Sequence, residues 1–166
     1  MRERDIRATF LDEKGHPISG ALLYAEAVTE EGPISFVFAR SGQAGEVPEV
    51  AIRALKIPWK RGARLSLAGF AEGRRPVVLH DPTRSVPSDG VSLTLAPAVS
   101  AADEWNPELL LLEFPFEKNP RLAQELRESR YSELRAAFRT ACGARPPEEP
   151  LGPEGAARIS AIQSLP

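Results

Sequence analysis

Cysteine is almost absent from this chain of 166 residues, because Cys142 is its only example. A single cysteine cannot form a disulfide within the chain, which excludes a small secreted fold held together by disulfides. Long apolar runs are also missing: runs such as Leu109 to Leu112 and Ala21 to Ala25 are far short of the ~20 residues that span a membrane. No apolar stretch of signal-peptide length follows the charged start of the chain. We therefore expect a cytoplasmic protein that is not inserted in a membrane.

An excess of charge of one sign is lacking as well. The chain carries 21 basic and 23 acidic side chains, a net charge of −2, which argues against a protein built mainly to coat nucleic acid or anionic lipid. The segment 53–84 is an exception, because eight of its side chains are basic and two are acidic. It leaves open a polyanion-binding or nucleic-acid-binding role for the basic residues Arg53, Lys60, Arg61 and Arg64.

Motifs of the common catalytic classes are missing. The sequence contains no G-x-S-x-G nucleophile turn, no H-E-x-x-H zinc motif, no C-x-x-C pair and no phosphate-binding glycine loop. Cys142 falls at the end of the apolar side of an expected helix, where a small core residue is a simpler interpretation than a nucleophile. We expect no catalytic residue, no cofactor and no metal ligand, so the chain is predicted not to be an enzyme.

Between residues 4 and 97 the chain is a series of short apolar or alternating runs separated by turn residues. This pattern is typical of an all-β sandwich. Seven strands are expected, over residues 5–11, 21–28, 34–40, 47–55, 64–70, 76–80 and 91–95. The sequence therefore predicts a mainly β domain over residues 1–98, a seven-stranded sandwich of the transthyretin or immunoglobulin kind.

Two segments of this domain carry a family resemblance. The turn 12–21 (DEKGHPISGA) follows the first expected strand and leads back into the sheet, and residues 62–70 (GARLSLAGF) end in Gly-Phe before a second run at 75–79. Together they resemble the carboxypeptidase regulatory-like domains, which are transthyretin-like sandwiches, over residues 5–97. In most cases this resemblance implies a non-catalytic accessory module.

Some sandwiches of this kind are enzymes. Intradiol dioxygenases hold iron with two tyrosines and two histidines, and this chain also has two of each: Tyr24, Tyr131, His16 and His80. Their spacing does not bring them together, because His16 lies in an expected turn and Tyr131 in an expected helix. A metal-dependent enzyme on a transthyretin-like scaffold is therefore the least favoured of the three hypotheses.

Beyond residue 98 the turn-rich pattern stops and helix signals begin. Asn106-Pro107 and Asn119-Pro120 each combine a helix N-cap with a proline at the first helical position. An amphipathic pattern follows over 121–143, whereas residues 106–114 fit either a short helix or a buried strand. We expect a helical appendage over 99–143, followed by a tail over 144–166 that consists of a proline-rich linker, 144–153, and a short terminal helix. The appendage and tail together then hold two or three helices.

A short helix on a stiff tether is marginal alone and buries its apolar face only by docking. We therefore expect a non-enzymatic protein-binding or scaffolding module, an accessory subunit whose partner is another protein. The predicted partner-binding residues are Trp59, Lys60, Arg61 and Arg64 in the basic segment and Ile159, Ile162 and Leu165 in the tail. Polyanion binding through residues 53–75 is the alternative, and the sequence specifies no oligomeric state.

Overall fold

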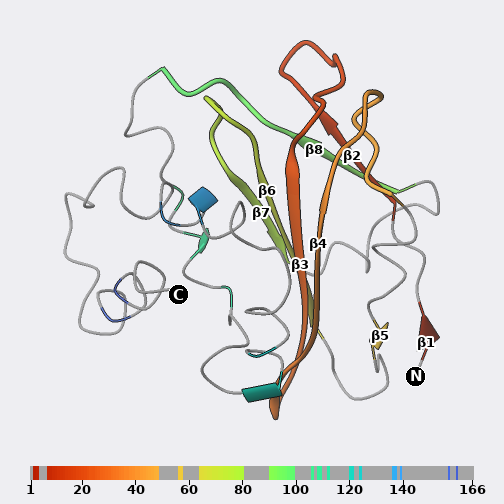
Figure 1. Cartoon of the computed structure of the whole chain (residues 1–166), viewed down its shortest axis with the longest axis vertical. Helices are drawn as coiled ribbons and strands as arrows, with labels where there is room; N and C mark the ends of the chain where they lie inside the picture. The colour runs from red at the N-terminus through yellow and green to blue at the C-terminus, as the bar shows by residue number, and fades with distance from the viewer. Residues whose placement is uncertain are drawn as a thin grey trace.

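In the computed structural model of the chain, the described residues are 2–3, 7–48, 56–57, 64–80 and 90–99, with single positions between 106 and 160. They are mainly β, as expected, and contain eight strands (Figure 1). In chain order these are β1 (Arg2–Glu3), β2 (Ala8–Leu11), β3 (Leu22–Thr29), β4 (Gly32–Arg40), β5 (Lys56–Ile57), β6 (Arg64–Phe70), β7 (Val77–His80) and β8 (Val91–Thr94). Six of the seven expected strands have a counterpart, and the seventh, 47–55, lies mostly outside the described residues.

The larger layer is an antiparallel sheet with the strand order β4–β3–β6–β7. β3 and β4 form a hairpin, and their register shifts at a bulge between Ala27 and Val28. Pro33 lies in the turn region between the expected strands 21–28 and 34–40, but in the structure it is the second residue of β4. A proline is tolerated there because β4 is an edge strand of this sheet, where alternate backbone N–H groups need no partner within the sheet.

The smaller layer pairs two strands that are far apart in the chain. β2 and β8 run parallel, with Phe10 opposite Leu93. Ala8 and Phe10 are two residues apart on β2 and so point to the same face, and both side chains are buried. They belong to one hydrophobic core with Leu23 of β3 and Leu67 of β6. The fold is therefore β-sandwich-like, with its core between the two layers (Figure 1).

The second face of the four-stranded sheet is buried as well. Tyr24 and Glu26 alternate with the core residues of β3 and so point to the other face, yet both have almost no exposed surface. Of the described residues beyond position 98, Leu109 is fully buried, and Nδ2 of Asn106 donates a hydrogen bond to the carbonyl oxygen of Pro76 at 3.0 Å. Asn106 therefore ties the segment after the sandwich to the residue that precedes β7.

The turn after β2 has the geometry that its sequence predicts. Oδ1 of Asp12 accepts the backbone N–H groups of Lys14 at 2.9 Å and His16 at 2.8 Å. The hydrogen bond from His16 lowers the pKa of Asp12 below its ordinary value of 3.8. Gly15 has φ 82°, the positive value expected at this point of the turn. Asp12 and Gly15 of the turn that carries the family resemblance thus have a local structural reason.

The helices predicted over 121–143 and 154–165, the segment 106–114 that fits either a short helix or a strand, and the linker 144–153 lie largely outside the described residues and stay predictions. Asn106 caps a short turn, as expected: its Oδ1 accepts the backbone N–H of Glu108 at 3.0 Å, and its carbonyl oxygen accepts that of Leu109 at 3.1 Å. Within the described part of the chain, no helix is long and apolar enough to cross a membrane.

Candidate ligand-binding site

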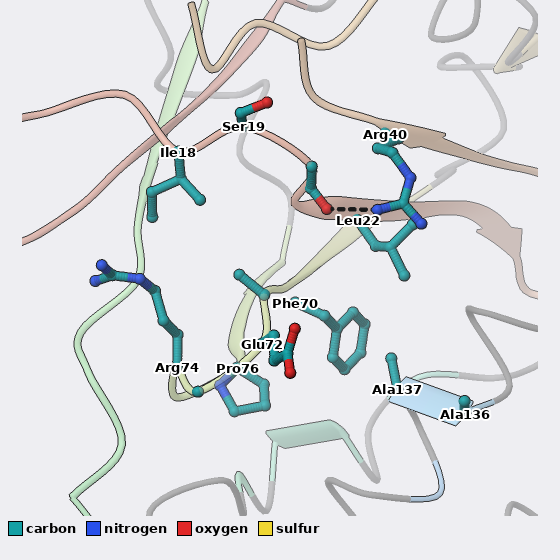
Figure 2. A pocket seen from close by; sticks show the side chains of 13 residues that line it. Ile18, Ser19, Leu22, Arg40, Phe70, Glu72, Arg74, Pro76, Ala136 and Ala137 are labelled. Carbon is teal, nitrogen blue, oxygen red and sulfur yellow. Dashed lines mark hydrogen bonds between the residues drawn. The ribbon is translucent and has the colours of Figure 1, made fainter. Parts of the chain in front are cut away.

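A pocket of about 660 Å³ lies at one end of the four-stranded sheet (Figure 2). It forms where β4 ends and β3 begins: Arg40 is opposite Leu22, and Leu22 is opposite Phe70 at the end of β6. Directly opposed residues of antiparallel strands point to the same face, so these three side chains stand in one row. The wall is completed by the segment 18–20, by residues of the turn 71–76, and by Ala136 and Ala137.

The pocket combines apolar side chains with charged ones. Phe70 and Pro76 are buried and Leu22 is half-buried, so the apolar wall is largely shielded from water before anything binds. Arg40 and Arg74 lie on opposite sides of the pocket in Figure 2. Apolar walls with a few placed polar groups are typical of sites for small organic ligands.

The two arginines have different roles. Arg74 is half-buried and tied to the scaffold, because its Nη1 donates to the carbonyl oxygen of Leu95 at 2.9 Å and lies 3.2 Å from Oε2 of Glu13. Arg40 is exposed, and its Nη1 donates to the carbonyl oxygen of Gly20 at 2.9 Å, which orients the guanidinium over the pocket (Figure 2). Arg40 is therefore the more exposed of the two arginines that line the pocket.

Ser41 holds the segment that forms one side of the pocket. Its hydroxyl donates to the carbonyl oxygen of Ile18 at 2.7 Å and accepts the backbone N–H of Ala21 at 2.9 Å. Its backbone N–H donates to the carbonyl oxygen of Ala21 at 2.8 Å. Ser41 is buried, so water does not replace these bonds when they are lost.

Replacing Ser41 with alanine is expected to lower the free energy of unfolding by about 1–3 kcal/mol, because a buried N–H and a buried carbonyl lose their partner. Urea denaturation measures the loss. Ser19→Ala is the matched control, because Ser19 is an exposed serine in the segment 18–20, which the Ser41 hydroxyl holds. This substitution should change the free energy of unfolding by less than ~0.5 kcal/mol. Equal losses for the two variants would contradict a role for the Ser41 hydroxyl in holding this segment.

A row of buried polar side chains crosses the same face of the sheet, farther along β3. Oη of Tyr24 donates to Oε2 of Glu26 at 2.9 Å, and Oγ of Ser66 lies 2.9 Å from Nδ1 of His80. The register places Glu26 opposite Ser66 and Ser66 opposite His80. Burial, the negative charge of Glu26 and the hydrogen bond to it raise the pKa of Tyr24 well above its ordinary value of 10.0.

A serine beside a histidine is one of the arrangements used in nucleophilic catalysis. Here Ser66 has no exposed surface and does not line the pocket, so a substrate in the pocket does not reach its hydroxyl. This partly buried pair instead ties β6 to β7 through their side chains.

Metal ligands do not gather in the described part of the chain. There, no group of three or more His, Cys, Asp and Glu side chains is placed to hold a metal ion. Of the two-tyrosine and two-histidine set, His16 lies in the exposed turn after β2, whereas Tyr24 and His80 lie within the sheet. Tyr131 and Cys142 are outside the described residues.

Of the predicted partner-binding residues, the structure describes Arg64, and the others lie outside the described residues: Trp59, Lys60, Arg61, Ile159, Ile162 and Leu165. Arg64 is the first residue of β6, whereas Arg74 and Arg75 follow the end of that strand. These three basic residues therefore lie at opposite ends of one strand and do not form a single patch.

The pocket residues were not predicted as a site. Arg40 and Phe70 each end an expected strand, which in the sequence indicates only a strand boundary. The feature of the sequence that points to the pocket is an arginine and an aromatic residue at the ends of two expected strands. Only the register of β3 with both neighbours places them on either side of Leu22.

Comparison with known proteins gives a limited result. No family model matches the sequence, and no curated protein matches it. Among solved structures, the chain is similar to a 3-chlorocatechol 1,2-dioxygenase from Rhodococcus opacus 1CP, with 16% sequence identity and a TM-score of 0.37. The match covers 59% of this chain and spans 63% of the length of that enzyme. The similarity is a distant one in fold, and it assigns neither a family nor an activity.

Proposed function

We propose that the chain is a non-enzymatic binding module that attaches to another protein by adding an extended segment of that partner to β4. The observation that carries this proposal is the position of β4. It is nine residues long, it forms an edge of the four-stranded sheet, and within the described residues it pairs with β3 alone. An edge strand presents a row of backbone donors and acceptors to which a further strand can pair.

The two ends of β4 differ in a way that supports this role. Proteins commonly protect edge strands with prolines and bulges. Pro33 and the bulge opposite Ala27 and Val28 lie near the start of β4, whereas the register from Ser35 to Arg40 is regular. Phe36 and Phe38 in that regular part are half-buried and so still accessible. An added strand gains backbone hydrogen bonds and covers these aromatic side chains.

Two further features support a binding role over catalysis. Tyr24, Glu26 and Ser66 are buried in the sheet, where a substrate has little access to their polar groups. The turn capped by Asp12 has the Asp, Gly and Pro of the carboxypeptidase regulatory-like domains, which are accessory modules in most cases. Membership of that transthyretin-like family is part of this proposal.

Site-specific photo-crosslinking in the native host tests the proposal. Phe38 is replaced by the photoreactive p-benzoylphenylalanine, which keeps an aromatic side chain at the regular part of β4. Ser92, an exposed residue of β8, receives the same group as the matched control. We expect a discrete crosslinked protein from the Phe38 position and none from the Ser92 position. The crosslinked protein, once purified, is expected to slow hydrogen exchange of the backbone amides of residues 35–40.

The alternatives give different results. A crosslink between two copies of this chain would show that β4 pairs with itself, and would replace the partner by a second copy. The same products from both positions, or no slowing of exchange in β4, would contradict strand addition. Salt-sensitive capture of nucleic acid would instead favour the basic segment 53–75.

A further inference from the structure

The backbone groups of β4 alternate between those that face β3 and those that face away from it. The N–H of Ser41, directly after β4, donates to the carbonyl oxygen of Ala21 at 2.8 Å. In an antiparallel pair, hydrogen-bonded residue pairs alternate with pairs that exchange no hydrogen bond. Counted back from Ser41 in steps of two along the regular register, Val37 is hydrogen-bonded to β3. The N–H and carbonyl groups of its neighbours, Phe36 and Phe38, therefore point away from β3.

These outward groups are the points at which a further strand pairs with β4. β4 is an outer strand of its sheet, so the sheet itself supplies no partner on that side. The sheet is antiparallel throughout, and parallel pairing is slightly less stable per residue, so an antiparallel addition is favoured. Building on the proposed function, we propose that β4 binds a partner segment through two uncharged, aromatic or β-branched residues that lie two positions apart.

The spacing of the two partner residues follows from strand geometry. Val37 packs against the hydrophobic core, so the side chains of Phe36 and Phe38 point to the opposite face of the sheet. A partner residue that exchanges hydrogen bonds with either phenylalanine lies directly opposite it, with its side chain on the same face. One residue separates the two positions, because successive side chains of a strand alternate between faces.

The chemistry of the two partner residues follows from what they cover. The side chains of Phe36 and Phe38 are half-buried, and aromatic or β-branched neighbours across strands stabilise aromatic residues. The stretch from Ser35 to Ala39 contains no charged residue. A charged side chain opposite either phenylalanine would lose water without gaining a counter-charge from this stretch. Uncharged residues are therefore expected at both positions.

Short peptides test this inference on the full chain, with binding followed by the backbone amide signals in nuclear magnetic resonance spectra. The probe is acetyl-KSYSYSK-amide, in which a serine separates two tyrosines. Methylating the backbone nitrogen of one tyrosine removes an N–H that pairs with β4, and should weaken binding at least ~5-fold. Methylating the nitrogen of the central serine is the matched control, because that N–H points away from β4. It should leave the affinity within about twofold.

A second peptide tests the chemistry of the two positions. Acetyl-YSKSKSY-amide has the same composition and net charge as the probe, but lysines take the places of the tyrosines. We expect it to bind at least ~5-fold more weakly than the probe. Within residues 35–40, the amide signals of Phe36 and Phe38 should shift most on binding of the probe, because their N–H groups gain an acceptor. These comparisons need no variant of the protein, so no substitution can perturb its folding.

Four results would overturn the proposal. These are equal affinities of the two methylated peptides, equal affinities of the probe and the lysine-exchanged peptide, no binding of the probe, and a dimer in analytical ultracentrifugation whose Phe36 and Phe38 amides exchange slowly without peptide. The last result would assign the edge to a second copy of the chain. After any of the first three, a crosslink from the Phe38 position to another protein would still support strand addition, so the two proposals fail separately.

Discussion

Replacing Gly45 with alanine is expected to lower the free energy of unfolding by about 2–5 kcal/mol. Gly45 has φ 75°, a conformation that costs other residues ~1–2 kcal/mol. A Cβ atom there would overlap the carbonyl oxygen of Phe10 and would lie 3.1 Å from Cβ of Pro17. Relieving such overlap in a packed region adds ~1–3 kcal/mol.

The loss is large because the loop 41–47 cannot simply move away. The carbonyl oxygen of Gly45 accepts a hydrogen bond from the backbone N–H of Phe10 at 2.8 Å. The backbone N–H of Val47 donates to the carbonyl oxygen of Ala8 at 3.0 Å. The carbonyl of Phe10 that the new Cβ would meet also accepts the N–H of Ile18 at 2.9 Å. A shift of the loop would therefore disturb β2 and the segment that forms the pocket wall together.

Gly15→Ala separates the two causes of this loss. Gly15 also has positive φ, at 82°, but a Cβ atom there meets nothing within 4 Å. It should therefore lose only the conformational part, about 1–2 kcal/mol. Urea denaturation of both variants gives the difference. If the two variants lose the same amount, the contact with the Phe10 carbonyl does not contribute.

Local sequence pattern predicted the strands well, because turns and alternation are local properties. The turn at Asp12 and Gly15 and the strands β3, β4, β6, β7 and β8 lie close to where the pattern places them. Burial on the second face was harder to predict. Glu26 and Ser66 are polar residues, which local pattern assigns to a solvated face, yet both are fully buried. Burial of that face depends on contacts between distant parts of the chain, which local pattern does not contain.

The pocket could not be predicted from the sequence for a related reason. Thr29 is opposite Gly32, so an uninterrupted hairpin would place Leu22 opposite Ala39. The bulge at Ala27 and Val28 shifts this register by one residue and brings Arg40 opposite Leu22 instead. A one-residue shift moves a side chain to the other face of a sheet. The bulge thus decides that an arginine and not an alanine stands at the pocket.

Replacing Tyr24 with phenylalanine is expected to lower the free energy of unfolding by about 2–3 kcal/mol near neutral pH. The Tyr24 hydroxyl donates to Oε2 of Glu26 at 2.9 Å, and both side chains are buried. Hydrogen bonds to charged groups contribute ~1.5–3 kcal/mol, and water cannot take the place of the lost donor in a buried site. Urea denaturation near neutral pH measures this loss.

The same substitution is expected to change the alkaline side of the stability profile. The pKa of Tyr24 is raised above its ordinary value of 10.0 in the folded state, so the folded phenol keeps its proton after the unfolded phenol has lost it. The corresponding stability is complete below pH 10.0 and is lost as the pH rises toward the folded pKa, by up to ~1.4 kcal/mol per pH unit. Tyr24→Phe removes this contribution, whereas every other alkaline group stays the same.

Glu26→Gln gives the intermediate case. The amide oxygen can still accept the Tyr24 hydroxyl, but the negative charge is gone. Burial is the largest cause of the raised pKa of Tyr24 and remains in this variant, so only part of the alkaline loss should disappear. Urea denaturation between about pH 8 and about pH 11 should therefore show the steepest decline for the unmodified chain, a smaller one for Glu26→Gln and the smallest for Tyr24→Phe. A Tyr24→Phe variant that declines as steeply as the unmodified chain would show that another group controls alkaline stability.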